Sequence, residues 1–261
     1  RNNNSRFGID PEGPDLKILL TMIKTLINVK LIGLHCHFPF RDLKSFRLRA
    51  EKLSSLIKVI FPKNLPEIIN IGGGYRSENM PLSLSKSKLK FSDYAKLIGK
   101  ILSKNFSKEK KCPTLFLEPG TALVADCQSF VTSVNSIKLI RGVGFATVAG
   151  SIFDISPNAK TTNLPVTAIL NPNLKRNKYH SMYNVVGYTC IETDYLTKNL
   201  KVPLAEGDFL VYDNVGSYSV VMRPPFILPS NPILLYNGKN KPLKLIKRRQ
   251  SNSDIFKLFK Y

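Results

Sequence analysis

The sequence lacks an uninterrupted run of about 18 apolar residues, which is the length that a membrane-spanning helix needs. Its start, Arg-Asn-Asn-Asn-Ser at residues 1–5, is polar, and no apolar segment typical of a secretory signal follows it. These absences argue against a spanning segment and against secretion through such a signal. We therefore expect a protein with no membrane partner.

Cysteine is scarce, and the 4 copies lie far apart without the C-x-x-C spacing that indicates a metal site. They are Cys36, Cys112, Cys127 and Cys190. We interpret all of them as free thiols, which are typical of a reducing compartment. The sequence therefore predicts a cytoplasmic protein without a bound metal ion.

Acidic residues are few: 18 Asp and Glu stand against 39 Lys and Arg, for a net charge of +21. Such an excess can indicate binding to nucleic acid or to an anionic surface. The lysines are scattered, however, and the densest basic patch, residues 241–249, is interpreted as a solvated tail segment. We favour a general Lys and Asn bias and expect no nucleic-acid partner, with a basic binding protein as the weaker alternative.

Helical and extended patterns alternate as far as about residue 125. Apolar spacing predicts helices over residues 14–28, 42–60 and 91–103, and strands over 29–38, 67–71 and 114–117. Strands that alternate with helices of this length imply βαβ units and a parallel sheet. We expect residues 1–125 to form part of a (β/α) barrel.

Short β-branched runs dominate from about residue 125 onward, and their connections carry Pro, Asn and Gly. The runs cover residues 130–140, 145–152, 165–170, 183–186 and 209–219. This pattern predicts a mostly antiparallel β domain over residues 126–261. The fold class is therefore α/β plus β.

Five positions could carry chemistry. The turn Gly72-Gly73-Gly74 follows a predicted strand, and backbone without Cβ atoms can approach an anion closely, although three glycines also make an ordinary tight turn. The others are His37 at the end of a strand, Glu118 before Pro-Gly, Cys190, and Tyr218. Taken singly, each also has a plain structural interpretation, as a core histidine, a surface glutamate, a small buried cysteine or a strand tyrosine.

Four segments occur together in an informative order: GLHCH at 33–37, GGGY at 72–75, EPG at 118–120 and GYTC at 187–190. Their order and spacing resemble the cofactor-binding loops of the fold-type III pyridoxal-phosphate-dependent decarboxylases, the diaminopimelate and ornithine decarboxylase relatives. The resemblance runs from Ser5 to about Pro225. It implies the C-terminal part of an alanine-racemase-like TIM barrel that binds pyridoxal 5'-phosphate, followed by the β domain.

The resemblance also implies roles for individual residues. The turn Gly72 to Gly74 would bind the cofactor phosphate, and His37 would stack on the cofactor ring. Glu118 would face the pyridine nitrogen and keep it protonated, so that the ring can accept electrons. Cys190 would deliver a proton after loss of CO₂, and Tyr218 would give its hydroxyl to the phosphate, both from the other subunit of a homodimer.

The sequence departs from the family pattern at several positions. Pro39-Phe40 stand where Gly-Ser is usual, and Thr121 stands where the diaminopimelate and ornithine enzymes have arginine. Ser156 aligns with an arginine that holds a substrate carboxylate, and Ile191 with a carboxylate that holds the distal amino group. These differences argue against free meso-diaminopimelate. They favour decarboxylation of a diamino acid or a conjugated diamino acid of the siderophore or polyamine type.

The resemblance begins at Ser5-Arg6-Phe7-Gly8, downstream of the lysine that holds the cofactor as a Schiff base in this family, and the first residue is not methionine. We therefore expect an N-terminally truncated chain whose 261 residues alone are inactive. The alternative to a decarboxylase is a non-catalytic truncated remnant of one.

Overall fold

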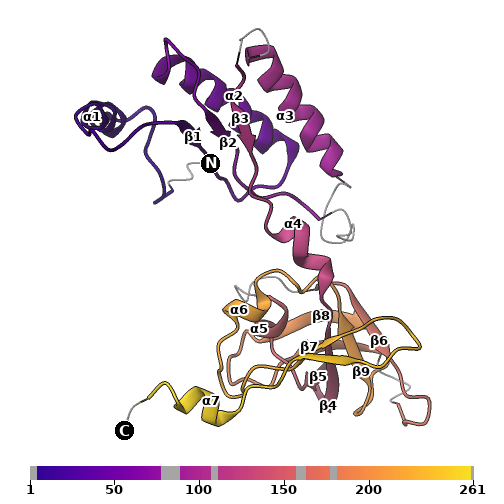
Figure 1. Ribbon diagram of the computed structural model, residues 1–261. Coiled ribbons are helices and arrows are strands. Elements are labelled where there is room, and N and C mark those ends of the chain that lie inside the picture. Colours follow the sequence, from indigo (N-terminus) through magenta and orange to yellow (C-terminus); the bar gives the residue numbers. More distant parts are fainter. Residues whose placement is uncertain (1–4, 78–88, 107–110, 157–162, 177–180, 260–261) are drawn as a thin grey trace. The chain divides into compact units, whose positions relative to one another are not determined.

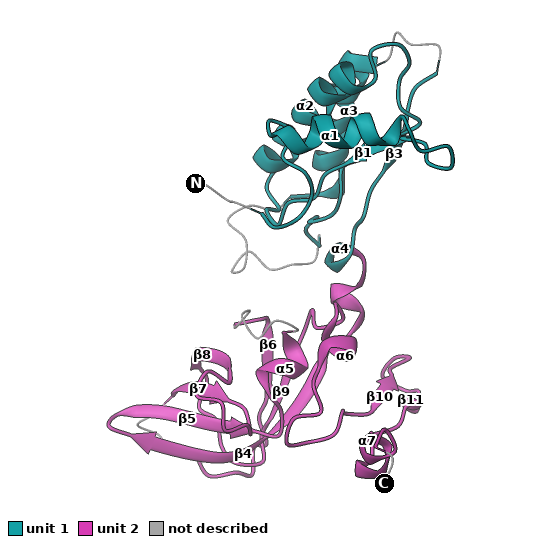
Figure 2. Ribbon diagram, turned by 90° about the vertical axis from the view of Figure 1, so that its left-hand side faces the viewer, with its two compact units in different colours: residues 1–78, 88–122 teal, residues 79–87, 123–261 magenta. Residues whose placement is uncertain are grey.

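The computed structural model describes residues 5–77, 89–106, 111–156, 163–176 and 181–259 (Figure 1). The chain divides into two compact units, which Figure 2 colours separately. Unit 1 contains residues 1–78 and 88–122, and unit 2 contains residues 79–87 and 123–261. The chain leaves unit 1 through α4 (Thr121–Val124) and a 3-10 turn at Ala125–Cys127.

Unit 1 is built on a three-stranded parallel sheet in the order β1-β2-β3. The strands are β1 (Gly33–His35), β2 (Ile68–Asn70) and β3 (Thr114–Phe116). Gly33 pairs with Ile68, which pairs in turn with Thr114. The helices are α1 (Pro14–Ile23), α2 (Leu43–Ile60) and α3 (Phe91–Phe106). Because the strands are parallel, the loops that follow them leave from one edge of the sheet.

Helix α2 begins after Asp42, whose side chain accepts a hydrogen bond from the Ser45 N–H at 2.8 Å. Its buried apolar side chains recur every three or four residues, which gives one apolar face. They pack against β2 and α3 in the core of unit 1. This core includes Phe46, Ala50, Leu53, Ile57, Ile69, Ile71, Tyr94 and Ile98. Helix α1 buries no residue.

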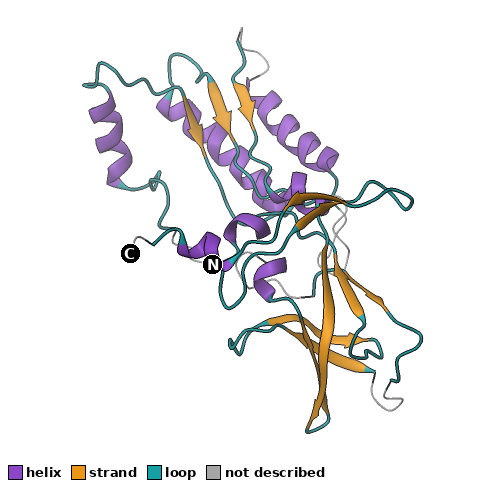
Figure 3. Cartoon of the chain, turned by 60° about the horizontal axis from the view of Figure 1, so that its bottom comes forward, coloured by secondary structure: helices purple, strands orange, loops and turns teal. Residues whose placement is uncertain are grey.

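Unit 2 contains a six-stranded mixed sheet in the order β6-β9-β4-β5-β7-β8 (Figure 3). The strands are β4 (Phe130–Ile140), β5 (Val143–Val148), β6 (Val166–Ile169), β7 (Met182–Val186), β8 (Tyr195–Lys201) and β9 (Phe209–Tyr212). Strands β5 and β7 pair in parallel, and the other neighbours pair antiparallel. Buried Val134, Val148, Val185, Leu196 and Leu210 are part of its core.

Unit 2 differs from the sequence expectation in three places. The run 209–219 is a strand only as far as Tyr212, because the chain then turns at Gly216, where a Cβ would overlap the carbonyl oxygen of Val124. Strand β8 was not predicted. The segment 241–249, interpreted as a solvated tail, contains β11 (Lys244–Lys247), which pairs with β10 (Ile233–Leu235). The short helices are α5 (Ile152–Ile155), α6 (Ser219–Met222) and α7 (Asn252–Phe256).

Candidate functional site

The loops after β1, β2 and β3 meet in unit 1. The Cys36 N–H donates to the carbonyl oxygen of Asn70 at 3.0 Å, and the Glu118 N–H donates to that of Gly72 at 3.1 Å. These bonds continue the sheet past the ends of its strands. They bring three of the sequence-predicted elements together, namely the loop with His37, the glycine turn and Glu118.

The glycines of the turn are required by this close approach. Gly72 has φ of 71° and Gly74 has φ of 90°, a region that side chains other than glycine's rarely adopt. A Cβ on Gly72 would overlap the carbonyl oxygen of Cys36, and one on Gly73 would overlap that of Glu118. The absence of side chains therefore lets the turn pack between its two neighbouring loops.

His37 is oriented by the same turn. The Gly73 N–H donates to His37 Nδ1 at 3.1 Å, so this nitrogen acts as an acceptor and carries no proton. The proton of the neutral ring is then on Nε2. His37 is exposed, so its side chain remains accessible beside the turn.

The Glu118 carboxylate is oriented by two neighbours and remains accessible. Asn70 Nδ2 donates to Oε1 at 2.8 Å, and His35 Nε2 lies 3.3 Å from Oε2. The side chain of Glu118 is 48% exposed. Asn70 also accepts from the Gly72 N–H at 2.9 Å, so one side chain fixes both the carboxylate and the turn. Sequence reasoning missed Asn70, although a polar residue directly before the three glycines was a usable signal.

Arg49 of α2 is the second residue that sequence reasoning missed. It is only 2% exposed, and its guanidinium makes five hydrogen bonds, which is as many as its N–H groups allow. The acceptors are the Ser45 hydroxyl and the carbonyl oxygens of Phe38, Phe40, Ile71 and Gly73. Burial lowers the pKa of Arg49, since desolvation disfavours the charged form. The available signal was a charged residue within the apolar face of α2.

Cys36 lies beside this arginine and is not a candidate for chemistry. Burial raises the pKa of its thiol to about 11, and the Arg49 charge offsets only part of that effect. Burial likewise raises the pKa of Tyr75 to about 12. Both groups therefore stay protonated at neutral pH and act as packing residues of the loop cluster.

In unit 2, Cys190 lies in the loop between β7 and β8 and is an exposed free thiol. The loop is held by Asp194, which is 3% exposed. Asp194 Oδ1 accepts from the Ile152 N–H at 2.7 Å and the Ser151 hydroxyl at 3.1 Å, and Oδ2 accepts from the Thr189 hydroxyl at 2.6 Å. A buried carboxylate thus fixes the loop while the thiol remains open to solvent.

Tyr218 precedes α6 and has an unusual backbone. Its φ of 64° lies in the left-handed region, which costs a non-glycine residue about 1–2 kcal/mol. The side chain is 51% exposed. No hydrogen bond joins Tyr218 to Cys190 among the residues that the structure describes. The strain places an exposed phenol at the start of the helix, which is a common feature of functional positions.

The two positions from which the sequence analysis inferred the substrate class also lie in unit 2. Ile191 is 37% exposed, directly after Cys190. Ser156 is buried at the end of α5, and Pro157 lies outside the described residues. Near α5, Asp154 forms an ion pair with Arg223, whose Nη2 donates to the Tyr188 hydroxyl at 2.8 Å. Burial raises the pKa of Asp154, and Arg223 opposes that shift.

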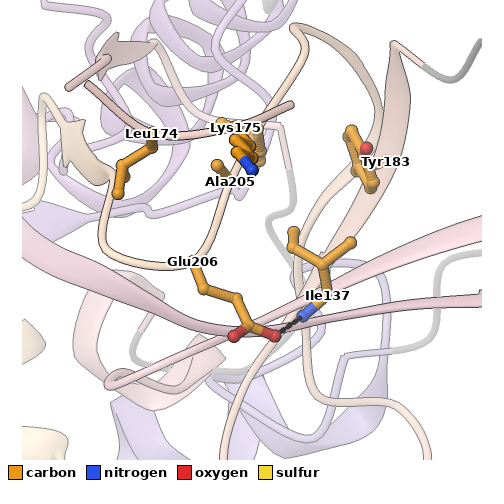
Figure 4. Close-up of a pocket in the computed structure, with 7 residues that line it drawn as sticks. Ile137, Leu174, Lys175, Tyr183, Ala205 and Glu206 are labelled. Carbon is orange, nitrogen blue, oxygen red and sulfur yellow. Dashed lines mark hydrogen bonds between the residues drawn. The ribbon is translucent and has the colours of Figure 1, made fainter. Parts of the chain in front are cut away.

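A shallow cavity of about 280 Å³ lies elsewhere in unit 2 (Figure 4). Its polar lining residues are Lys175, Tyr183 and Glu206, and the Glu206 carboxylate accepts from the Ile137 N–H at 3.0 Å. It contains none of the candidate residues. Within the described part of the chain, no group of three or more His, Cys, Asp or Glu is arranged to hold a metal ion. No helix there is long and apolar enough to cross a bilayer.

The loop cluster of unit 1 falls in a region with a clear relationship to known proteins. Residues 1–125 match the family model described as "Pyridoxal-dependent decarboxylase, pyridoxal binding domain". Over these residues the chain is similar to the pyridoxal-binding domain of the pyridoxal-dependent decarboxylases.

Individual decarboxylases are similar to this chain over nearly its whole length. Diaminopimelate decarboxylase of Bacillus subtilis is 24% identical over an aligned length of 267 positions, gaps included. The alignment covers 98% of this chain and 58% of that protein. The structure of diaminopimelate decarboxylase from M. jannaschii superposes with a TM-score of 0.80 at 21% identity, over 97% of this chain and 57% of that one. The structure of the Paramecium bursaria Chlorella virus arginine decarboxylase superposes with a TM-score of 0.67 at 18% identity. This superposition covers 85% of this chain and 57% of that one. The chain thus spans somewhat more than half the length of these decarboxylases.

Proposed function

We propose that the protein is a pyridoxal-phosphate-dependent amino-acid decarboxylase in which the loop cluster of unit 1 binds the cofactor. The observation that supports this most strongly is the position of Glu118. Its carboxylate is held by Asn70 and His35, is half exposed, and lies beside the glycine turn that also orients His37. An accessible, fixed carboxylate is what a protonated ring nitrogen requires.

The residues of the cluster fit the cofactor. The turn packs against its neighbouring loops so closely that a Cβ on Gly72 or Gly73 would overlap their carbonyl oxygens, and the Gly74 N–H donates to no described acceptor. Gly72 to Gly74 would therefore hold the phosphate, Glu118 the ring nitrogen, and His37 one face of the ring. When bound, the pyridine ring supplies an electron sink for the charge left by departing CO₂. As in the sequence-based prediction, the partial (β/α) barrel would be the framework of this site.

The protein's own residues then have separate tasks. Through its carboxylate, Glu118 would keep a proton on the ring nitrogen of the bound cofactor. Cys190 is exposed and free, and its thiol can give a proton to the carbon that has lost CO₂. Tyr218 presents its hydroxyl as a further donor to the phosphate.

We infer that the protein forms a homodimer with shared active sites, since the candidate residues are divided between two units. Gly72 to Gly74, His37 and Glu118 would come from one subunit, and Cys190 and Tyr218 from the other. Mixing a Glu118→Ala chain with a Cys190→Ala chain, each in full-length form, should then restore activity through the one intact site of a mixed dimer. If the mixture stays as inactive as either parent, the shared site is wrong.

The substrate we propose is a diamino acid or a conjugated diamino acid of the siderophore or polyamine type. Ile191 offers no acceptor to a distal ammonium group, and Ser156 is buried and carries no positive charge for a remote carboxylate. A charged group without a partner is costly to desolvate, so free meso-diaminopimelate should be a poor substrate. Efficient turnover of meso-diaminopimelate in a comparison of kcat/KM across diamino acids would contradict this.

The proposed activity is tested by CO₂ release from a panel of amino acids with the full-length protein and Glu118→Gln. This change keeps the shape of the side chain but removes the charge that holds the ring proton, and turnover should fall by about 100-fold or more. Glu67→Gln, an exposed glutamate of the same unit, is the matched control and should be as active as wild type. Equal activity of all three proteins would contradict the role of Glu118.

A further inference from the structure

Arg49 is a buried cation that has no ion-pair partner in the part of the chain that the structure describes. All of its hydrogen bonds there go to neutral oxygens. Asp42 offsets part of its desolvation, but from a distance. A buried guanidinium normally has a carboxylate partner. Among the described residues, the positive charge of Arg49 is thus only partly offset, and it lies next to the loops that its hydrogen bonds hold.

The acceptors of Arg49 fix the direction of the peptide groups around it. Nη1 binds the carbonyl oxygen of Gly73 at 2.6 Å, and Nη2 binds those of Phe38 and Phe40, each at 2.7 Å. In a trans peptide the N–H points opposite to the C=O. With the Gly73 oxygen facing the guanidinium, the N–H of Gly74 faces away from it.

The two effects act on the same place. The Gly74 N–H has no described acceptor, and a Cβ on Gly74 would lie 3.5 Å from Arg49 Nη2. The turn therefore presents a donor on its outer side and has a positive charge behind it. An outward N–H group over a buried cation favours an anion, and a dianion most of all. Since all five N–H groups of Arg49 are used, it acts without touching that anion.

We propose that Arg49 is a positioning residue for phosphate binding at the turn Gly72 to Gly74: it holds the loops after β1 and β2 by their backbone and supplies the charge that selects a phosphorylated ligand. The proposal rests on the proposed function and names the feature that makes its site prefer a phosphate. It also explains how the loop stays in place where Pro39-Phe40 replace Gly-Ser, since the arginine binds carbonyl groups and not side chains.

The test compares two ligands in the purified protein. Pyridoxine 5'-phosphate has no aldehyde and cannot react with lysines, and pyridoxine lacks only the phosphate. Calorimetry should show that Arg49→Met weakens the binding of pyridoxine 5'-phosphate about tenfold or more. The affinity for pyridoxine should change little. Arg47→Met removes the same charge from the exposed side of the same helix and should leave both affinities unchanged.

Each outcome decides between the ideas. If Arg49→Met lowers the affinity for both ligands equally, or lowers neither affinity, the role of Arg49 in phosphate selection is overturned. If Arg49→Met does not fold, Arg49→Lys is judged by the same difference, and failure of both variants to fold would assign Arg49 to the general core and reject the proposal. Wild-type protein that binds neither ligand would instead reject the proposed function itself.

Discussion

The two units hold their candidate residues in opposite ways. In unit 1, buried Arg49 donates five hydrogen bonds to neutral oxygens and fixes the loops beside His37 and Glu118. In unit 2, buried Asp194 accepts hydrogen bonds from N–H and O–H groups and fixes the loop that carries Cys190. The loops of unit 1 are thus held by a cation that donates hydrogen bonds, and the loop of unit 2 by an anion that accepts them.

This difference teaches how an exposed reactive group can be held still. A single charged side chain can satisfy several backbone dipoles at once, and each hydrogen bond to a charged group is stronger than one between neutral groups. A counterion would take up part of that capacity. The absence of an ion pair at Arg49 and at Asp194, among the described residues, thus leaves the full hydrogen-bonding capacity for the loops.

The largest expected effect on stability comes from removing the Asp194 carboxylate, which holds the loop in unit 2. Asp194→Ala leaves the Ile152 N–H and the hydroxyls of Ser151 and Thr189 without their acceptor, and should lower the free energy of unfolding by about 2–4 kcal/mol. Urea denaturation measures this loss. Glu192→Ala, an exposed change in the same loop, is the control. Equal stability of the two variants would mean that Asp194 does not organise the loop.

The corresponding change in unit 1 adds a methyl group to the glycine turn and so disturbs the packing of its backbone. Gly73→Ala pushes a methyl group against the carbonyl oxygen of Glu118, and should cost about 2–3 kcal/mol because neither loop can move freely. Gly99→Ala in α3 has open space around it and should stabilise the protein by about 0.5–1 kcal/mol. Thermal unfolding of both variants checks the contrast. A Gly73 variant as stable as the Gly99 variant would contradict the tight packing of the turn.

A smaller effect on stability is expected from changing Asp42, which caps the start of the helix that carries Arg49. Asp42→Ala removes the acceptor of the Ser45 N–H and should cost about 1 kcal/mol. Asp42→Asn keeps an acceptor but removes the charge, so it should cost only a small part of that amount. Circular dichroism during chemical denaturation separates the two. If Asn is as damaging as Ala, the contribution of Asp42 is electrostatic and not a helix cap.

The smallest effect compares the cysteines of the two units at alkaline pH. The pKa of Cys36 is raised from 9.0 to about 11, so the folded state holds this proton more tightly than the unfolded state. Its contribution to stability is complete below pH 9.0 and is lost as the pH rises to about 11. Cys36→Ala should flatten this part of the stability profile, whereas Cys190→Ala, at an exposed thiol, should not. Identical profiles for the two variants would contradict the burial of Cys36.

Local signals in the sequence located much of the framework. The cap at Asp42 and the apolar period predicted a helix over 42–60, and the structure has α2 at Leu43–Ile60. The β-branched run predicted a strand at 130–140, where β4 lies. The strand expected over 29–38 is confined to Gly33–His35, because β2, with which it pairs in the described sheet, contains just three residues.

The candidate site was less accessible to sequence reasoning. Asn70 acts through Glu118, 48 positions away along the chain, so its role depends on the pairing of parallel strands. Arg49 looked like a polar interruption of an apolar face, because its acceptors belong to loops 9 to 24 residues distant. Motifs therefore indicated the candidate side chains, and only the fold identified the residues that hold them.

The backbone-directed grip of Arg49 also bears on protein engineering. Because the guanidinium binds the carbonyl oxygens of Phe38 and Phe40, it is indifferent to the side chains that these positions carry. The loop that borders the proposed ligand could then be diversified at residues 38 and 40 without loosening its attachment. A combinatorial library at these positions, with Arg49 kept constant, would be a practical route to altered ligand preference in a chain whose scaffold remains intact.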